Sequence, residues 1–183
     1  MKNASMTQRL QVMLFVALVI ASIAVAFYAF GFQLRIVGDP GFHARFDEVA
    51  LFSTMHVVGG GLCLGLGGFQ FSKRLRTKHL DLHRNMGRVY LILVLIGGCG
   101  SLVLAPRADG GLVAKLGFGM LAAAWLFSAL QAYLAVLRKD IASHRAWMMR
   151  NFSLTFAAVT LRIYLGMFAA LDVAFDDAYQ SVA

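Results

Sequence analysis

Residues 50–71 read ALFSTMHVVGGGLCLGLGGFQF, and this stretch decides the fold because none of its side chains is Asp, Glu, Lys or Arg. An α-helix rises about 1.5 Å per residue and the hydrocarbon core of a bilayer is about 30 Å thick, so about 20 apolar residues cross it. The stretch therefore predicts a membrane-spanning helix from Ala50 to Phe71.

Four further stretches have the same character and predict helices over residues 11–32, 89–105, 116–137 and 152–175. The whole chain of 183 residues is 60% hydrophobic and only 14% charged, whereas a soluble domain has about a quarter charged residues. This composition excludes a soluble enzyme and a disordered tail. It predicts an all-α integral membrane protein with five transmembrane helices in a single domain of residues 1–183.

The first stretch has two interpretations. Lys2 and Arg9 precede it, and Ala24-Val25-Ala26 resembles the cleavage site of a signal peptide. Its apolar run of about 20 residues is longer than the 7–15 residues of a signal h-region. We therefore favour a true first helix over residues 11–32.

The basic residues predict the orientation in the membrane, because cytoplasmic loops are enriched in Lys and Arg. With the amino terminus inside, the inner segments hold twelve of the 17 basic residues and the outer segments hold four. The chain is thus expected in a bacterial plasma membrane, with its amino terminus inside and its carboxyl terminus outside. Its net charge of +8 fits anionic lipid head groups as partners and requires no nucleic acid.

An offset of 61 residues relates two parts of the chain. Gln70 precedes His83-Arg84 by thirteen residues, and Gln131 precedes His144-Arg145 by the same number. Each unit reads as a helix ending near a Gln, a basic loop, a His-Arg pair and another helix. We therefore expect two repeated hairpins, over residues 50–105 and 116–175, that form a pseudo-twofold four-helix bundle with helix 11–32 outside it.

His56 and its neighbouring glycines form the first candidate site. His56 lies about 9 Å below the outer end of its helix, at the 1.5 Å rise per residue. One interpretation is a polar contact between helices, and the other is a cofactor ligand or a proton or quinone site, since ionisable groups at membrane depth are functional candidates. Gly61 and Gly65 form a G-x-x-x-G step, which predicts close helix packing or room for a flat cofactor.

His83 and His144 occupy equivalent positions near the inner boundary, and this predicts a possible haem b site. Two imidazoles at one depth can ligate the haem iron from opposite sides, with Arg84 and Arg145 near the propionates. The alternative is that each His-Arg pair caps the start of a helix and anchors it to lipid phosphate. Without haem, no cofactor is implied by these residues.

Arg162 lies ten positions into the last predicted helix, about 15 Å along it and close to the middle of the membrane. A central arginine is costly to insert and needs carbonyls, water or an anion as partners. It is either satisfied by carbonyls within the bundle or it binds a carbonyl or anionic ligand. We expect Arg162 and His56 to line one polar pocket that opens toward the outside.

No complete set of catalytic residues is present, so the sequence leaves open whether the protein is an enzyme. The histidines favour a haem- or quinone-linked role in electron transfer. The alternative is a non-enzymatic accessory protein that binds lipid head groups or another membrane subunit. A small transporter ranks third, because five helices are few for alternating access.

Two motifs carry a resemblance to a known family. They are HRNMGRVY at residues 83–90 and HRAWMMRN at residues 144–151, accompanied by His56, Gln70, Asp140 and Arg162. Over roughly residues 50–165 the chain resembles the domain-of-unknown-function 2306 family of predicted membrane proteins. This resemblance implies a small multispanning membrane protein and no particular reaction. The plan of four helices with histidines is also similar to that of membrane b-type cytochromes.

Overall fold

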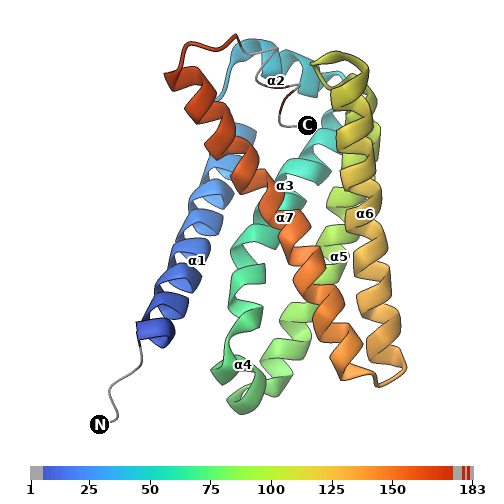
Figure 1. The fold of residues 1–183 in the computed structure, drawn as a ribbon. Coiled ribbons are helices and arrows are strands. Elements are labelled where there is room, and N and C mark those ends of the chain that lie inside the picture. Colours follow the sequence, from blue (N-terminus) through green and yellow to red (C-terminus); the bar gives the residue numbers. More distant parts are fainter. Residues whose placement is uncertain (1–5, 175–178, 180, 182–183) are drawn as a thin grey trace.

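The computed structural model describes residues 6–174, 179 and 181, and these form seven α-helices and two short 3-10 helices without a strand. The long helices are α1 (Met6–Gln33), α3 (Ala50–Gly67), α5 (Leu80–Leu104), α6 (Gly111–Leu137) and α7 (Ile141–Ala170). The short ones are α2 (Pro40–Asp47), α4 (Lys73–Lys78), η1 (Gly68–Phe71) and η2 (Ala105–Arg107). We call the end that carries α4 the basic end and the opposite one the α2 end (Figure 1).

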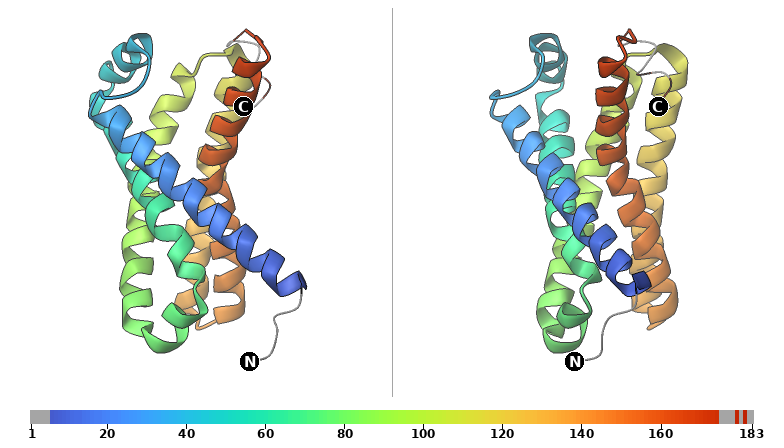
Figure 2. Two further views of the ribbon diagram at one scale, coloured as in Figure 1. Left: turned by 90° about the vertical axis from the view of Figure 1, so that its left-hand side faces the viewer. Right: turned by 60° about the vertical axis from the view of Figure 1, so that its left-hand side comes forward.

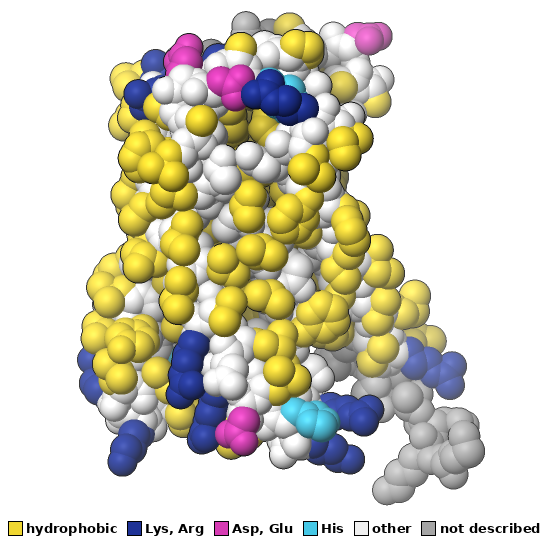
Figure 3. Space-filling model, turned by 180° about the vertical axis from the view of Figure 1, so that it is seen from behind, with side chains coloured by type: hydrophobic (Ala, Val, Ile, Leu, Met, Phe, Trp, Pro, Cys, Tyr) yellow, Lys and Arg dark blue, Asp and Glu magenta, His cyan; other side chains and the backbone are white. Residues whose placement is uncertain are grey.

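The five long helices are apolar enough, and long enough, to cross a membrane. A belt of hydrophobic side chains surrounds the molecule, and Lys and Arg gather beyond it at the basic end (Figure 3). A lipid environment satisfies such a surface, whereas water does not. The chain is therefore an all-α integral membrane protein, as predicted.

The helices α5 and α7 begin well before the predicted residues Val89 and Phe152, at Leu80 and Ile141. The prediction was wrong here because hydropathy marks the part of a helix inside the hydrocarbon, while backbone hydrogen bonding continues into the polar turns before it. His83 and His144 are consequently fourth in their helices rather than in loops. The predicted end at Phe175 lies outside the described residues, and α7 itself ends at Ala170.

The two expected hairpins are α3 with α5 and α6 with α7, and both pairs are in contact. α7 lies beside α6 at the basic end and leans away from it toward the α2 end (Figure 1). The starts of α5 and α7 obey the 61-residue offset, but the preceding segments differ. Gln70 lies in η1, followed by Ser72, whose side chain caps α4, whereas α6 continues past Gln131 to Leu137. The expected helix end near Gln131 is therefore wrong, and the pseudo-twofold relation stays a prediction.

Glycines set how closely the helices approach. A Cβ atom on Gly59 would lie 3.2 Å from the Cα atom of Gly97, so α3 and α5 meet backbone to backbone. Gly61 packs instead against Ala29 of α1, which crosses the bundle obliquely (Figure 2). Gly60 and Gly65 have no such neighbour within 4 Å. Close packing and open space are thus both present on α3, at different glycines.

Candidate functional site

A network of buried polar side chains joins α5, α6 and α7. Asn151 and Thr155 are four residues apart and therefore share one face of α7. The Tyr90 hydroxyl donates to Asn151 Oδ1 (2.9 Å) and lies 2.8 Å from Thr155 Oγ1. The Trp125 indole donates to Thr155 Oγ1 (2.9 Å), and Asn151 Nδ2 donates to the Trp125 carbonyl and Ser128 Oγ, both at 2.8 Å.

Every side-chain N–H and O–H of this network has an acceptor. Thr155 donates to the Asn151 carbonyl and Ser128 to that of Trp125. Tyr90 and Asn151 are fully buried, and satisfied polar groups in such a site fix the relative positions of the helices that carry them. The network therefore serves to hold the bundle together.

A cavity of about 910 Å³ begins at Trp125 and Thr155 of this network and extends to the α2 end of the bundle. Residues of α1, α3, α5, α6 and α7 line it. Besides tyrosines, six aromatic side chains line it: Phe32, Phe42, Phe46, Phe118, Trp125 and Phe168. Gly60 also borders it, and the missing side chain leaves part of this space. The volume is typical of a binding pocket for a small molecule.

His56 lines the cavity from α3 and is held by Ser101 of α5. Its Nδ1 atom lies 2.7 Å from Ser101 Oγ, and the Ser101 hydroxyl donates to the Gly97 carbonyl at 2.8 Å. Among the described residues, none forms a hydrogen bond with His56 Nε2. His56 is thus both an interhelical contact, through Nδ1, and a lining residue of the cavity.

Arg162 lines the same cavity from α7, so the two residues share one pocket as predicted, but the walls of this pocket are largely apolar rather than polar. Its guanidinium donates to the Ala158 carbonyl one turn earlier (2.8 Å) and lies over the ring of Tyr28 from α1, 5.1 Å from the ring centre. The carbonyl that accepts from it belongs to its own helix. The expected opening toward the outside stays a prediction.

At the α2 end an ion pair connects two segments that border the cavity. Arg45 of α2 binds Asp109, which follows η2, and its guanidinium also lies 4.3 Å from the centre of the Phe42 ring. Tyr179 packs against Phe118 with ring centres 5.3 Å apart. Burial raises the pKa of Tyr179, and the negative charge of Asp109 raises it further. Ionic and aromatic contacts therefore partly close this end.

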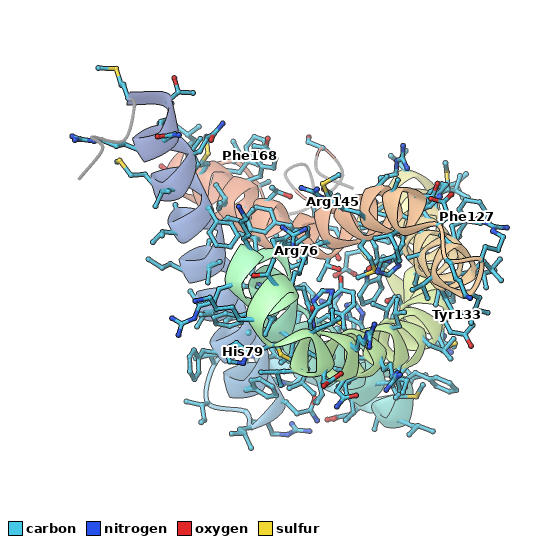
Figure 4. The ribbon with its side chains drawn as sticks, turned by 90° about the horizontal axis from the view of Figure 1, so that it is seen from below. Arg76, His79, Phe127, Tyr133, Arg145 and Phe168 are labelled. Carbon is cyan, nitrogen blue, oxygen red and sulfur yellow. The ribbon has the colours of Figure 1, made fainter. Side chains whose placement is uncertain are left out.

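The remaining predicted site residues lie at the basic end. His144 Nδ1 donates to the Ala132 carbonyl of α6 (2.9 Å). Arg84 and Arg145 are exposed, and Arg84 lies 3.8 Å from Asp81. Arg145 of α7 and Arg76 of α4 are visible from this end in Figure 4. Neither His83 nor His144 lines the cavity, so the structure separates them from His56 and Arg162.

Several buried polar atoms at the basic end have no partner among the described residues. They are both amide atoms of Gln70, Arg76 Nε and His83 Nδ1. Internal water commonly satisfies such atoms. In the described part of the chain, no three residues among His, Cys, Asp and Glu come together as a group that could hold a metal ion.

Sequence reasoning missed Ser101 and most of the central network. Ser101 is one serine in an apolar helix, and only its position one turn after Gly97 hints at a bond to the backbone. Tyr90 and Asn151 lie within the two motifs quoted for the family resemblance. The usable signal was the pair Asn151 and Thr155, two polar residues on one face of an otherwise apolar helix.

The fold and these sites define a helical membrane protein with an internal cavity. A family model described as predicted membrane protein (DUF2306) matches residues 53–183, and the chain belongs to this family. The match begins in α3 and includes His56 and Arg162, the two predicted site residues that line the cavity. Comparison with curated proteins found no match, and neither did comparison with solved structures.

Proposed function

We propose that the protein binds an apolar molecule with a polar head group, such as a quinone or a lipid, in the cavity between its helices. The observation that carries this proposal is that His56 of α3 and Arg162 of α7 line one cavity of about 910 Å³ whose other walls are largely apolar and aromatic. Arginine at membrane depth is costly and is generally retained for function. A head group with an oxygen acceptor would use the guanidinium N–H groups.

The aromatic walls favour a ligand that contains a ring, because flat side chains stack on flat molecules. A quinone belongs to this class of ligand, and we therefore include a quinone-linked role in electron transfer in the proposal. Phe32, Phe118 and Trp125 would contact the ring or its apolar tail from α1 and α6.

The experiment that tests binding compares two glycine substitutions on α3. Gly60→Leu should fill the cavity without a clash, whereas Gly65→Leu places the same side chain in open space away from the cavity. We expect mass spectrometry of organic extracts to find an apolar compound bound to the purified wild type and the Gly65 variant, and at least tenfold less on the Gly60 variant. Equal amounts on all three proteins would contradict the proposal.

Haem ligation by His83 and His144 is a second, independent proposal. The bond from His144 Nδ1 to the Ala132 carbonyl leaves Nε2 available, as in many iron-ligating histidines. Haem would supply one-electron transfer, with His83 as the other ligand. A Soret band and a b-type α-band in the purified protein would support it. A colourless protein from haem-replete cells would contradict it.

An accessory role is the alternative. The exposed apolar surface of α1 supports contact with another membrane subunit, and the cations at the basic end support contact with anionic lipid. This role predicts that His83→Gln is tolerated. Loss of function at an unchanged protein level would argue for chemistry at His83 instead.

We further propose that the basic end faces the cytoplasm of a bacterial plasma membrane, which places the cavity toward the outer leaflet. The excess of Lys and Arg at that end supports this orientation. A cysteine introduced at Lys139, in the turn between α6 and α7, should react with a membrane-impermeant thiol reagent in inverted vesicles and not in intact cells. Reaction in intact cells would reverse the assignment.

A further inference from the structure

The hydrogen-bond geometry around His56 favours one position for the proton of its imidazole. A carbonyl can only accept, so the single hydroxyl proton of Ser101 is used in its bond to the Gly97 carbonyl. In this arrangement Ser101 Oγ accepts from His56 Nδ1, which lies 2.7 Å away. The imidazole consequently has its proton on Nδ1, and Nε2 is left as an acceptor.

Arg162 disfavours a second positive charge on this imidazole. Arg162 lines the same cavity as His56. Two cations in an apolar space repel each other strongly, because the surroundings screen them poorly. The neutral form of His56, with a bare Nε2, is therefore the form that a ligand meets.

Arg162 presents the opposite chemistry. A guanidinium has five N–H donors and no acceptor, and the Ala158 carbonyl takes up the one bond that this side chain makes within its helix. The remaining N–H groups are available to an oxygen atom in the cavity. The cavity thus offers an acceptor on α3 and donors on α7.

We propose that the ligand is a hydroxylated aromatic molecule of the quinol class, whose hydroxyl donates to His56 Nε2 and whose second oxygen accepts from Arg162. This inference rests on the proposed binding function and narrows its ligand. A quinone has oxygen acceptors only, so it would satisfy Arg162 and leave His56 Nε2 unpaired. An acceptor left unpaired under a bound ligand weakens binding, so the site distinguishes the reduced form from the oxidised one.

The test measures the affinity for both forms of one molecule. Protein in lipid nanodiscs is titrated calorimetrically with a short-chain benzoquinol under anaerobic conditions, and separately with the matching benzoquinone. We expect the Kd of the quinol to be at least tenfold lower. Ser101→Ala should reduce this ratio several-fold while both forms still bind, because Nδ1 loses the partner that fixes its proton.

Ser153→Ala is the matched control, since Ser153 likewise donates to a carbonyl of its own helix but is exposed and away from the cavity. It should keep the wild-type ratio. Equal affinities for the two forms, or tighter binding of the quinone, would overturn the inference without contradicting the proposed binding function. An unchanged ratio in the Ser101 variant would overturn it as well. If neither form binds, the quinol class is wrong, and the Gly60 and Gly65 variants decide whether any ligand is bound.

Discussion

Two neighbouring regions of the bundle differ in how their polar side chains are hydrogen-bonded. In the network around Asn151, each side-chain donor has an acceptor in a neighbouring helix or in its own. In the cavity directly beyond it, His56 and Arg162 line a space of about 910 Å³. Trp125 and Thr155 belong to both regions and form the boundary between the network and the cavity.

The difference separates structural groups from binding groups. A polar group in hydrocarbon is costly unless it is paired, and the network meets that requirement within the protein. The cavity groups meet it only with water or a ligand. Substitutions in the network should therefore lower stability, and substitutions in the cavity should lower binding.

The largest effect is expected for Asn151→Leu. The change removes three side-chain hydrogen bonds and leaves the fully buried Tyr90 hydroxyl without Asn151 Oδ1 as its acceptor. We expect the free energy of unfolding to fall by about 3 kcal/mol, because three hydrogen bonds are lost and each contributes about 1 kcal/mol. Titration with SDS, followed by circular dichroism, measures this change.

Asn85→Leu is the control, because Asn85 is exposed near the basic end and bonds only to Arg88. It should change the free energy of unfolding by less than about 0.5 kcal/mol, as is usual for surface positions. If both variants unfold alike, the network does not hold the bundle together and the distinction between the two regions fails.

Most of the fold could be predicted because hydropathy reports directly on the membrane. Residues 50–71 predicted α3 with η1, and the other four stretches predicted the other long helices. The polar turns that begin α5 and α7 are not hydrophobic, so the helices predicted from hydropathy were too short at these ends. The helices α2 and α4 were missed for the same reason, since six or eight residues such as Lys73–Lys78 are too short and too polar to span a membrane.

The candidate site was predicted in part. The cost of a central arginine pointed to Arg162 and depth pointed to His56, and the two do line one cavity. The position of Arg162 was predicted wrongly, however, because α7 begins at Ile141 and Arg162 lies only eight residues before its end at Ala170. Ser101 could not be predicted, because its role depends on the distance between α3 and α5, which Gly59 and Gly97 set. A single sequence contains no measure of that distance.

The next effect in size is expected for Arg162→Leu, and it should appear in binding rather than stability. The Ala158 carbonyl that Arg162 bonds also accepts within the helix, so the change leaves no buried group unpaired. We expect the free energy of unfolding to stay within about 1 kcal/mol of the wild-type value. The amount of bound ligand should fall at least tenfold, since a hydrogen bond to a charged group contributes about 1.5–3 kcal/mol.

The matched variant Arg162→Lys keeps the charge but not the planar set of donors. It should also bind less ligand than the wild type. The ratio of ligand to protein after purification, measured by mass spectrometry, tests both. An Arg162→Leu protein as unstable as Asn151→Leu would place Arg162 among the structural groups instead.

The smallest effect is expected where a hydrogen bond is made in water, at the start of α7. The Asp140 carboxylate accepts from the Ser143 backbone N–H (3.0 Å), and this bond, with a contribution from the Ser143 hydroxyl, lowers the pKa of Asp140. Because the pKa of the folded state lies below that of the unfolded chain, about 3.9, the bond stabilises the protein above that pH. This stabilisation is lost as the pH falls through the folded pKa. Asp140→Asn keeps an oxygen acceptor but cannot titrate, so its melting temperature should fall less than that of the wild type between pH 5 and pH 3.

At pH 7, the melting temperature of Asp140→Ala should be slightly lower than that of the wild type, and this decrease should be much smaller than the decrease caused by Asn151→Leu. Identical pH profiles for the three proteins would show that the capping bond does not contribute. If Asp140→Ala lost as much stability as Asn151→Leu, burial would not explain which polar groups stabilise this bundle.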